Sequence, residues 1–219
     1  GANFTPIVPE DPWNPFGPLA NRTENSTVES LYKNNTANCY VVNNAGTYTF
    51  PLVYGNAIKG NKVNPSAYNG DIFVDHKGTK ISSPFIPGSY LTSTAKAVVL
   101  WSDAPQLVTE VSLSSTSQMM TVAGQNVRYI KFRVPKENIT PGNAVIALYD
   151  KDPSKGGTIV WSWHIWATEM PKEHTYYSGD IVLDRNLGAI TSYYQEGVEV
   201  EGLYYQWEKK IHIPRIQPV

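Results

Sequence analysis

The strongest hydrophobic pattern of the chain is residues 158–167, which hold three of its six tryptophans. Their β-branched and aromatic side chains predict a central β-strand. Successive side chains of a strand point to opposite faces, and one face of this strand carries Ile159, Trp161, Trp163 and Ile165. So large an apolar face needs a second layer to cover it. The opposite face is mixed and is expected to border any binding surface; it carries Val160, Ser162, His164 and Trp166.

Shorter apolar runs predict further strands, because turn residues separate them. They span residues 39–42, 47–50, 97–101, 107–113, 129–134 and 144–149. The turn-forming residues 43–46 predict a hairpin between the first two runs. Residues 150–157 are equally rich in turn formers and predict a second hairpin, which joins 144–149 to the tryptophan strand.

The N-terminal 36 residues have a different pattern. They place Pro6, Pro9, Pro12, Pro15 and Pro18 at a spacing of three, with Trp13 and Phe16 between them. Such spacing favours polyproline II and excludes a central strand. We expect an extended arm or linker, docked on the surface or leading to another domain, with a ligand for a proline-binding domain as the alternative. Residues 54–70 contain many Asn, Gly and Pro residues, which predict a long surface loop.

These elements predict one all-β domain. The expected fold is an antiparallel β-sandwich of the immunoglobulin or transthyretin kind over residues 37–219, with an irregular C-terminal segment at 171–219. The arm of residues 1–36 precedes it. A chain of 219 residues is long enough to bury a sizeable core.

The amino-acid composition limits the classes of partner and the cellular location that we expect. The net charge of −1 gives no field that would attract nucleic acid, so no nucleic-acid partner is expected. The charged fraction is only 17%, and neutral polar residues are plentiful, which favours a secreted β-rich protein. The chain has no apolar run of about 20 residues, so no transmembrane segment is expected.

The single cysteine, Cys39, cannot form an internal disulfide. Because it lies in an apolar strand run, we expect a buried, inert thiol. The predicted core therefore comprises Cys39 together with Trp101, Trp161 and Trp163.

The sequence contains few motifs that indicate a catalytic, metal or cofactor site. Its four histidines lack metal-ligand spacing, and it contains no phosphate-binding loop or nucleophile elbow, so no metal or cofactor is expected. The neighbours Asp184, Arg185 and Asn186 fit either a polar catalytic cluster or a structural network that ties a loop to the backbone, and the structural interpretation is favoured. Asn-x-Ser/Thr triplets are ascribed to chance in a chain rich in these residues.

Several motifs together resemble a known family. They lie at residues 37–42, 46–51, 141–147, 160–166, 183–189 and 202–207. Their order is similar to that in fimbrillin-like pilus-tip and cell-adhesion surface proteins of Bacteroidetes, whose distal part is similar to the Fibrobacter-type major paralogous domain. The resemblance covers roughly residues 37–207 and ends where Glu208 replaces a glycine of the pattern.

The resemblance implies a non-enzymatic surface adhesin, a pilus-tip or accessory subunit of a fimbrium. It implies an extracellular location at the cell surface, fimbrium or outer membrane, and other pilus subunits or surface proteins as partners, besides a glycan or host-matrix ligand. The alternative is a carbohydrate-binding module, in which Trp166, Tyr193 and Tyr194 are the candidate ligand contacts because exposed aromatic rings stack on sugars.

An enzyme such as a glycoside hydrolase ranks third. It would need two carboxylates about 5–10 Å apart. The sequence does not show which of Asp103, Glu110, Asp150 and Glu169 could form such a pair.

Overall fold

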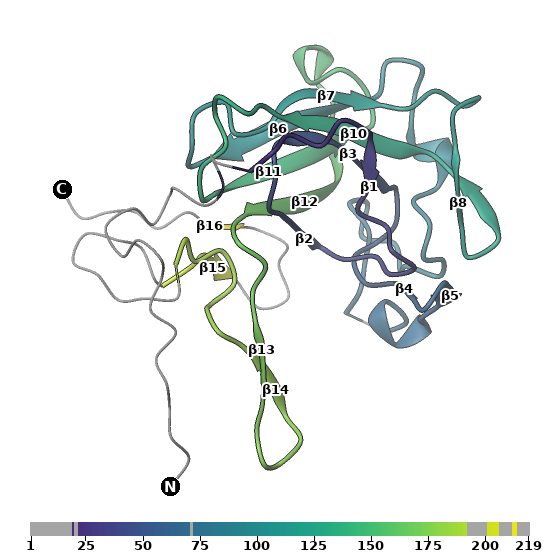
Figure 1. The fold of residues 1–219 in the computed structure, drawn as a ribbon. Helices are drawn as coiled ribbons and strands as arrows, with labels where there is room; N and C mark the ends of the chain where they lie inside the picture. Colours follow the sequence, from purple (N-terminus) through teal and green to yellow (C-terminus); the bar gives the residue numbers. More distant parts are fainter. Residues whose placement is uncertain (1–18, 20–21, 71, 192–200, 206–211, 214–219) are drawn as a thin grey trace, which may run out of the picture.

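Strands dominate the protein. The computed structural model describes residues 19, 22–70, 72–191, 201–205 and 212–213 (Figure 1). The elements of this part are β-strands and short 3₁₀ turns, as the all-β class requires. Within the described residues, two four-stranded sheets form the body, and four two-stranded ribbons accompany them. No helix among the described residues has the length and apolar character needed to cross a bilayer.

The first sheet has the order β1-β3-β10-β7. Its strands are β1 (Glu29–Ser30), β3 (Gly46–Pro51), β10 (Tyr129–Val134) and β7 (Thr109–Leu113). β10 runs antiparallel to both of its neighbours, whereas β1 is parallel to β3. The alternation in β10 is confirmed, because Ile130, Phe132 and Val134 are buried and Lys131 is exposed.

The second sheet has the order β2-β12-β11-β6. Its strands are β2 (Cys39–Val42), β12 (Ile159–Ala167), β11 (Gly142–Tyr149) and β6 (Lys96–Ser102). β11 pairs antiparallel with β12 and β6, which confirms the predicted hairpin across residues 150–157. β2 is parallel to β12. Both large sheets are therefore mixed, whereas a wholly antiparallel arrangement was expected.

Aromatic side chains join the two sheets. The rings of Phe50 on β3 and Trp163 on β12 lie 5.1 Å apart, and both side chains are completely buried. Tyr40 on β2 stacks on Phe50 at 5.2 Å. Within the first sheet, Phe132 continues the cluster towards Tyr48. The face of β12 that carries Trp161, Trp163 and Ile165 thus faces the first sheet, as its periodicity predicts.

The predicted hairpin between residues 39–42 and 47–50 is wrong. β2 pairs with β12 and β3 pairs with β10, so the chain passes from one sheet to the other between Val42 and Gly46. Paired in one hairpin, β2 and β3 could not stack Tyr40 against Phe50 across the interior. The crossing lets both strands bury their apolar faces against each other. Gly46 supports it with a φ of +152°, where an added Cβ would come within 2.9 Å of Asn25.

The segment from Arg22 to Thr36 belongs to the body, although the sequence places it in an extended arm. β1 lies in this segment, and Leu31 donates a backbone hydrogen bond to Thr49 at 2.8 Å. Thr36 is buried and accepts a bond from the backbone of Ile58. The bond of Leu31 extends the pairing of β1 with β3, and the bond to Thr36 ties the segment to β4. The spaced prolines, at positions 6–18, lie outside the described residues.

Residues 54–70 pack on the body more closely than a plain surface loop. They include β4 (Ile58–Lys59), β5 (Lys62–Val63) and the 3₁₀ turn η1 (Pro65–Ala67). Tyr54, Ile58 and Tyr68 are buried, and the ring of Tyr54 meets Trp161 edge-on at 4.9 Å. The polar turn residues of this segment therefore flank buried apolar side chains that fix it to the body.

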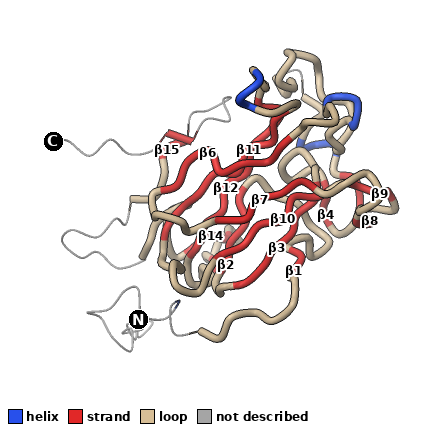
Figure 2. Tube along the Cα trace, turned by 90° about the horizontal axis from the view of Figure 1, so that it is seen from above, coloured by secondary structure: helices blue, strands red, loops and turns tan. Residues whose placement is uncertain are grey.

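The remaining short elements lie in the connections. They are η2 (Gly88–Tyr90), β8 (Met120–Val122), β9 (Gln125–Val127) and η3 (Pro153–Lys155). Viewed from above, the strands of the two sheets form the centre and most loops lie around their ends (Figure 2). After β12 the chain forms the ribbon of β13 (Glu173–Thr175) and β14 (Ile181–Leu183), followed by β15 (Tyr204–Tyr205) and β16 (His212–Ile213).

Two predicted core residues lie on the outer faces of their strands. On β2, Tyr40 and Val42 face the core, so Cys39 points the other way and is only half-buried. Trp101 is half-buried on β6 and is paired in register with Val145, which is outside the main core cluster. Strand alternation explains both positions, because a residue adjacent to an inward side chain must point outward.

The thiol of Cys39 should nevertheless react slowly. Burial raises its pKa to about 12. At pH 8 only about one molecule in ten thousand would then carry the reactive thiolate. A thiol reagent followed by absorbance should label the native protein at least a hundredfold more slowly than the protein in denaturant. Rapid stoichiometric labelling of the folded protein would contradict this environment.

Candidate functional site

The predicted sugar platform at Trp166 is wrong. Its side chain is only 1% exposed, and its indole nitrogen donates a hydrogen bond to the carbonyl of Ala189 at 3.0 Å. Residues 188 and 189, which follow β14, contact Trp166 and Asn143 on the outer face of the second sheet. The sequence pattern had suggested that this face borders a binding surface. The two other candidate contacts, Tyr193 and Tyr194, lie outside the described residues.

A buried polar network fastens that covering segment. The side chain of Asn143 on β11 donates to Asp103 at 2.7 Å and to the carbonyl of Gly188 at 3.0 Å. Its amide oxygen lies 2.8 Å from Nε2 of His164, and its backbone nitrogen donates to Asp103 at 2.6 Å. Because His164 and Asn143 are buried, no substrate could reach them. The arrangement fixes residue 188 to the sheet.

The cluster Asp184, Arg185 and Asn186 has a geometry that suits a structural network. Arg185 makes two parallel hydrogen bonds to Asp184, at 2.9 and 3.0 Å, and a third to the buried hydroxyl of Thr168 at 3.0 Å. Asn186 donates to the carbonyl of Glu201 at 3.3 Å. Bidentate pairing fixes both side chains in place. The cluster thereby joins the end of β12 to the end of β14.

The carboxyl of Asp184 titrates below its ordinary range. Burial works to raise its pKa, but the hydrogen bonds and charge of Arg185, together with the backbone of Lys172 and the charge of His174, lower it by more. A lowered folded-state pKa stabilises the protein at neutral pH, and this contribution is lost as the pH falls through about 4 and below. The pair of Asp184 and Arg185 therefore contributes its full stabilisation at neutral pH.

Gly202 and Leu203 make a second contact that holds the segment after β14. The φ of Gly202 is +76°, and a Cβ there would stand 2.4 Å from the carbonyl oxygen of Leu187. The next residue, Leu203, donates its backbone N–H to that same oxygen at 2.9 Å. A glycine is required for so close an approach. Residues 201–203 thus hold residues 186–189 in place.

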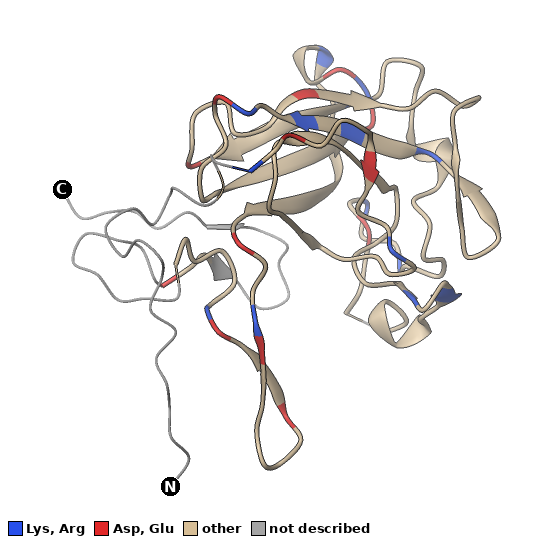
Figure 3. Ribbon diagram, in the orientation of Figure 1, with Lys and Arg blue, Asp and Glu red and all other residues tan. Residues whose placement is uncertain are grey.

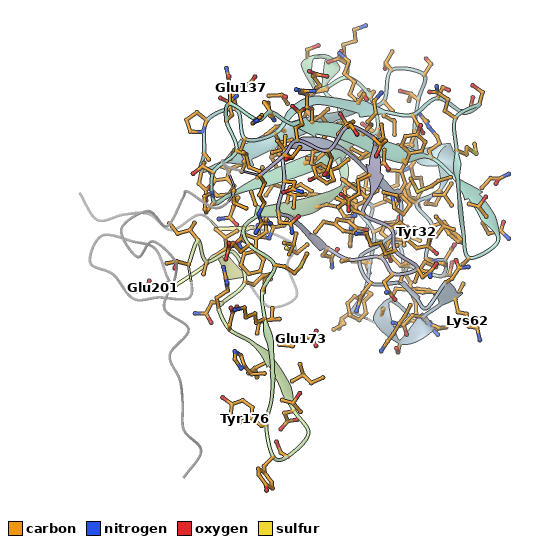
Figure 4. All side chains as sticks on the ribbon, viewed as in Figure 1. Tyr32, Lys62, Glu137, Glu173, Tyr176 and Glu201 are labelled. Carbon is orange, nitrogen blue, oxygen red and sulfur yellow. The ribbon has the colours of Figure 1, made fainter. Side chains whose placement is uncertain are left out.

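The ribbon of β13 and β14 projects from this anchored base. Figure 4 labels Glu173 and Tyr176 on it, and both lie well away from the two sheets. Six large apolar side chains of this region are each at least 40% exposed: Met170, Tyr176, Tyr177, Ile181, Val182 and Leu183. Ile181 and Leu183 point to one face of β14 and Val182 to the other, so β14 presents apolar side chains on both of its faces, beside the polar residues of β13.

Such exposure marks an interaction surface. An isolated two-stranded hairpin is marginally stable in water. Contiguous apolar surface on a soluble protein is typical of contacts with another protein or a ligand. We name residues 170–183 the projecting hairpin; it is the candidate site because a firm base carries a stem whose apolar side chains lack cover from the described residues.

The sequence contained a signal for this hairpin. The aliphatic run of residues 181–183 follows the turn formers Ser178, Gly179 and Asp180. In the structure Tyr176 donates to the carbonyl of Asp180 at 2.8 Å, and Gly179 donates back to Tyr176 at 2.9 Å. Residues 171–219 were predicted to be irregular, so the hairpin at 173–183 was not expected. Its three-residue strands are too short for periodicity alone to indicate them.

Charge does not single out the hairpin. Basic and acidic residues are interspersed over the body and along the ribbon (Figure 3). Arg185 is paired at the base of the projecting hairpin, and the hairpin itself carries Lys172, Glu173 and Asp180. A polyanion or polycation would therefore find no uniform field there. Apolar side chains, rather than a uniform charge, are therefore what distinguishes this surface.

A polar cluster in the loop before β6 has a structural role. Asp75 accepts hydrogen bonds from the backbone of Lys77 and Thr79 and from the hydroxyl of Tyr90. The bond to Asp75 raises the pKa of Tyr90. The ring of His76 packs edge-on against Tyr90 at 5.0 Å, with both nitrogens shielded from solvent. This cluster braces a loop and offers no accessible imidazole.

The carboxylates considered for hydrolysis have other partners. Asp103 holds Asn143, and Asp150 accepts the backbone N–H of Thr158 at 2.7 Å. The others form surface ion pairs, Glu169 with Arg22 and Glu110 with Arg133. Within the described ranges, no group of three His, Cys, Asp or Glu side chains could hold a metal ion.

Comparison of the chain with known protein families, with curated proteins and with solved structures found no match.

Proposed function

We propose that the protein is a non-enzymatic attachment module, a surface adhesin that serves as a pilus-tip or accessory subunit of a fimbrium. The proposal places it outside the cell, at the cell surface or outer membrane, with the two sheets acting as an immunoglobulin- or transthyretin-like sandwich scaffold. The observation that carries it is the projecting hairpin, an apolar element held on a firm base.

The energetics favour binding by the hairpin. Burying one Ile, Val or Leu side chain contributes about 1.5–3 kcal/mol. β14 carries three such side chains, Ile181 and Leu183 on one face and Val182 on the other, so covering them would supply a substantial part of the free energy of a specific contact. The anchored base also reduces the ordering cost that a free loop would incur on binding. Another pilus subunit, a surface protein or a host-matrix protein fits this aliphatic stem.

A carbohydrate-binding module remains the second candidate. One observation favours it: Tyr176 and Tyr177 are exposed at the hairpin turn, and Tyr177 is fully so. Tyrosine rings can stack on a sugar face while the hydroxyl stays hydrated. This role moves the candidate sugar contact from Trp166 to the turn of the hairpin.

The double change Ile181→Ser and Leu183→Ser tests the first function. Beads coated with the protein are presented with purified matrix proteins, cell surfaces and a glycan array. The double variant should reduce saturable binding to a protein target at least tenfold, because it removes the apolar contact. Its Tm should hardly change, because both side chains are solvent-exposed.

Two controls separate the candidates. Val28→Ser removes a comparably exposed apolar side chain from the body and should leave binding unchanged. Tyr177→Ala should abolish binding only if the target is a glycan. Undiminished binding by the double variant, or turnover of a glycoside or ester that one acidic residue controls, would overturn the proposal.

A further inference from the structure

The two strands of the projecting hairpin pair only with each other in the described part of the chain, so each strand has one open edge (Figure 1). Two backbone hydrogen bonds show which groups point to these edges. Tyr176 donates to the carbonyl of Asp180 at 2.8 Å, and Asp184 donates to the carbonyl of Lys172 at 2.9 Å. In an antiparallel ladder, hydrogen-bonded pairs alternate with pairs that share no hydrogen bond. Every second pair between these two ends is therefore bonded within the ribbon.

The open edge of β14 carries the backbone groups of Ile181 and Leu183. Val182 lies opposite His174 and belongs to the bonded set, so its N–H and C=O point into the ribbon. The N–H and C=O groups of Ile181 and Leu183 then point away from β13. The side chains of these two residues are 61% and 44% exposed. An open strand edge is a template for pairing with another chain, and this one combines unpaired backbone groups with exposed aliphatic side chains.

The open edge of β13 is less suited to pairing. By the same alternation it carries the backbone groups of Glu173 and Thr175, whose side chains are polar and exposed. Charged side chains on an edge strand oppose the addition of a further strand. The edge of β14 is therefore the one that favours a partner.

A second copy of the hairpin is a poor partner for this edge. Strands related by a two-fold axis run antiparallel, and only a register centred on Val182 would pair Ile181 of each copy with Leu183 of the other. That register places Asp180 of each copy opposite Asp184 of the other, at a position where facing side chains are close. Like charges directly opposite each other destabilise a strand pair. The charges therefore favour a different chain, with a basic residue at this position.

We propose that the partner of the projecting hairpin is an extended segment of another protein, which adds to the open edge of β14 as an antiparallel strand. Its side chains opposite Ile181 and Leu183 are aliphatic. A Lys or Arg lies opposite Asp180, whose exposed carboxylate accepts a hydrogen bond from Ser178 at 2.7 Å. In strand addition, main-chain hydrogen bonds provide affinity and alternate side chains provide specificity. This inference rests on the proposed attachment function and specifies the class of partner and its mode of contact.

Hydrogen exchange measured by NMR on the full chain tests the pairing residue by residue. The probe is the acetylated peptide amide Ser-Val-Thr-Val-Lys, whose valines fall opposite Leu183 and Ile181 in the antiparallel register. Without peptide, the amides of Ile181 and Leu183 should exchange at least tenfold faster than that of Val182, which is bonded within the ribbon. At millimolar peptide, these two amides should slow at least tenfold. If they did not slow, or if Val182 exchanged as fast as they do without peptide, the proposal would be wrong.

Two matched peptides identify the groups that bind. N-methylation of both valines keeps their side chains but removes their N–H donors, so this peptide should give no protection. A peptide with glutamate in place of lysine should bind at least threefold more weakly, because it places a like charge opposite Asp180. Equal protection by the N-methylated peptide would show that apolar contact is sufficient, and would overturn strand addition without affecting the attachment function.

The remaining outcomes separate this inference from the proposed function. If the amides of Ile181 and Leu183 became protected with rising protein concentration in the absence of peptide, the edge would belong to a second copy and the proposal would be overturned. The peptide measurement needs no natural target. A lack of binding to matrix proteins, cell surfaces and glycans would therefore count against the attachment function alone, whereas protection by the peptide would still support strand addition.

Discussion

Replacing Trp163 with alanine should lower the free energy of unfolding by about 3–5 kcal/mol, as large-to-small changes of a buried tryptophan do. Trp163 is completely buried on β12, and its ring meets Phe50 of the opposite sheet at 5.1 Å. The cavity would open between the two sheets, at the contact that joins them. Urea unfolding followed by circular dichroism measures the loss.

Lys131→Ala provides the control for this prediction. Lys131 lies on the exposed face of β10, between the buried Ile130 and Phe132. Its truncation should change the free energy of unfolding by no more than about 0.5 kcal/mol. Equal shifts for the two variants would show that Trp163 is not in the core.

Replacing Asn143 with alanine should lower the free energy of unfolding by about 2–4 kcal/mol, because buried partners would lose their hydrogen bonds. The amide serves Asp103, His164 and the carbonyl of Gly188. The loss should also be local. Hydrogen exchange should accelerate around residues 188–189, because Asn143 ties that segment to the sheet.

Asn126→Ala is the matched change on the surface. Asn126 lies exposed on β9, and the same truncation there should leave both stability and exchange near residue 188 unaltered. If the Asn143 variant unfolded with unchanged stability, the network would contribute nothing to holding the C-terminal segment.

Local pattern was enough to predict the central features of the fold. Trp163 and Ile165 alternate with outward side chains over nine residues, long enough for the period of a strand to be unmistakable. The turn formers of residues 150–157 lie between two such strands, so the β11–β12 hairpin follows from neighbours in the sequence. Both features depend on interactions within about 25 residues of the chain.

The errors concern pairings that local pattern does not encode. β2 takes β12 as its partner, more than a hundred residues away, so the turn at residues 43–46 looked like a hairpin although the chain crosses between sheets. Trp166 was expected to be exposed because nothing near it in sequence shows that Ala189 will cover it. The same limit hid the anchor at Asn143, whose partners are 40, 21 and 45 positions away.

The parallel pairing of β2 with β12 determines how the molecule would carry a mechanical load. Hydrogen bonds from His164 to Asn38, at 2.8 Å, and from Thr168 to Val42, at 3.1 Å, extend along this pair. Tension between the N-terminal side of β2 and the hairpin that follows β12 pulls the two strands past each other along their length. The bonds between them are then loaded together in shear, whereas a hairpin pulled apart from its open end loses its bonds one at a time. The parallel pair of β2 and β12 is thus arranged to resist being pulled apart.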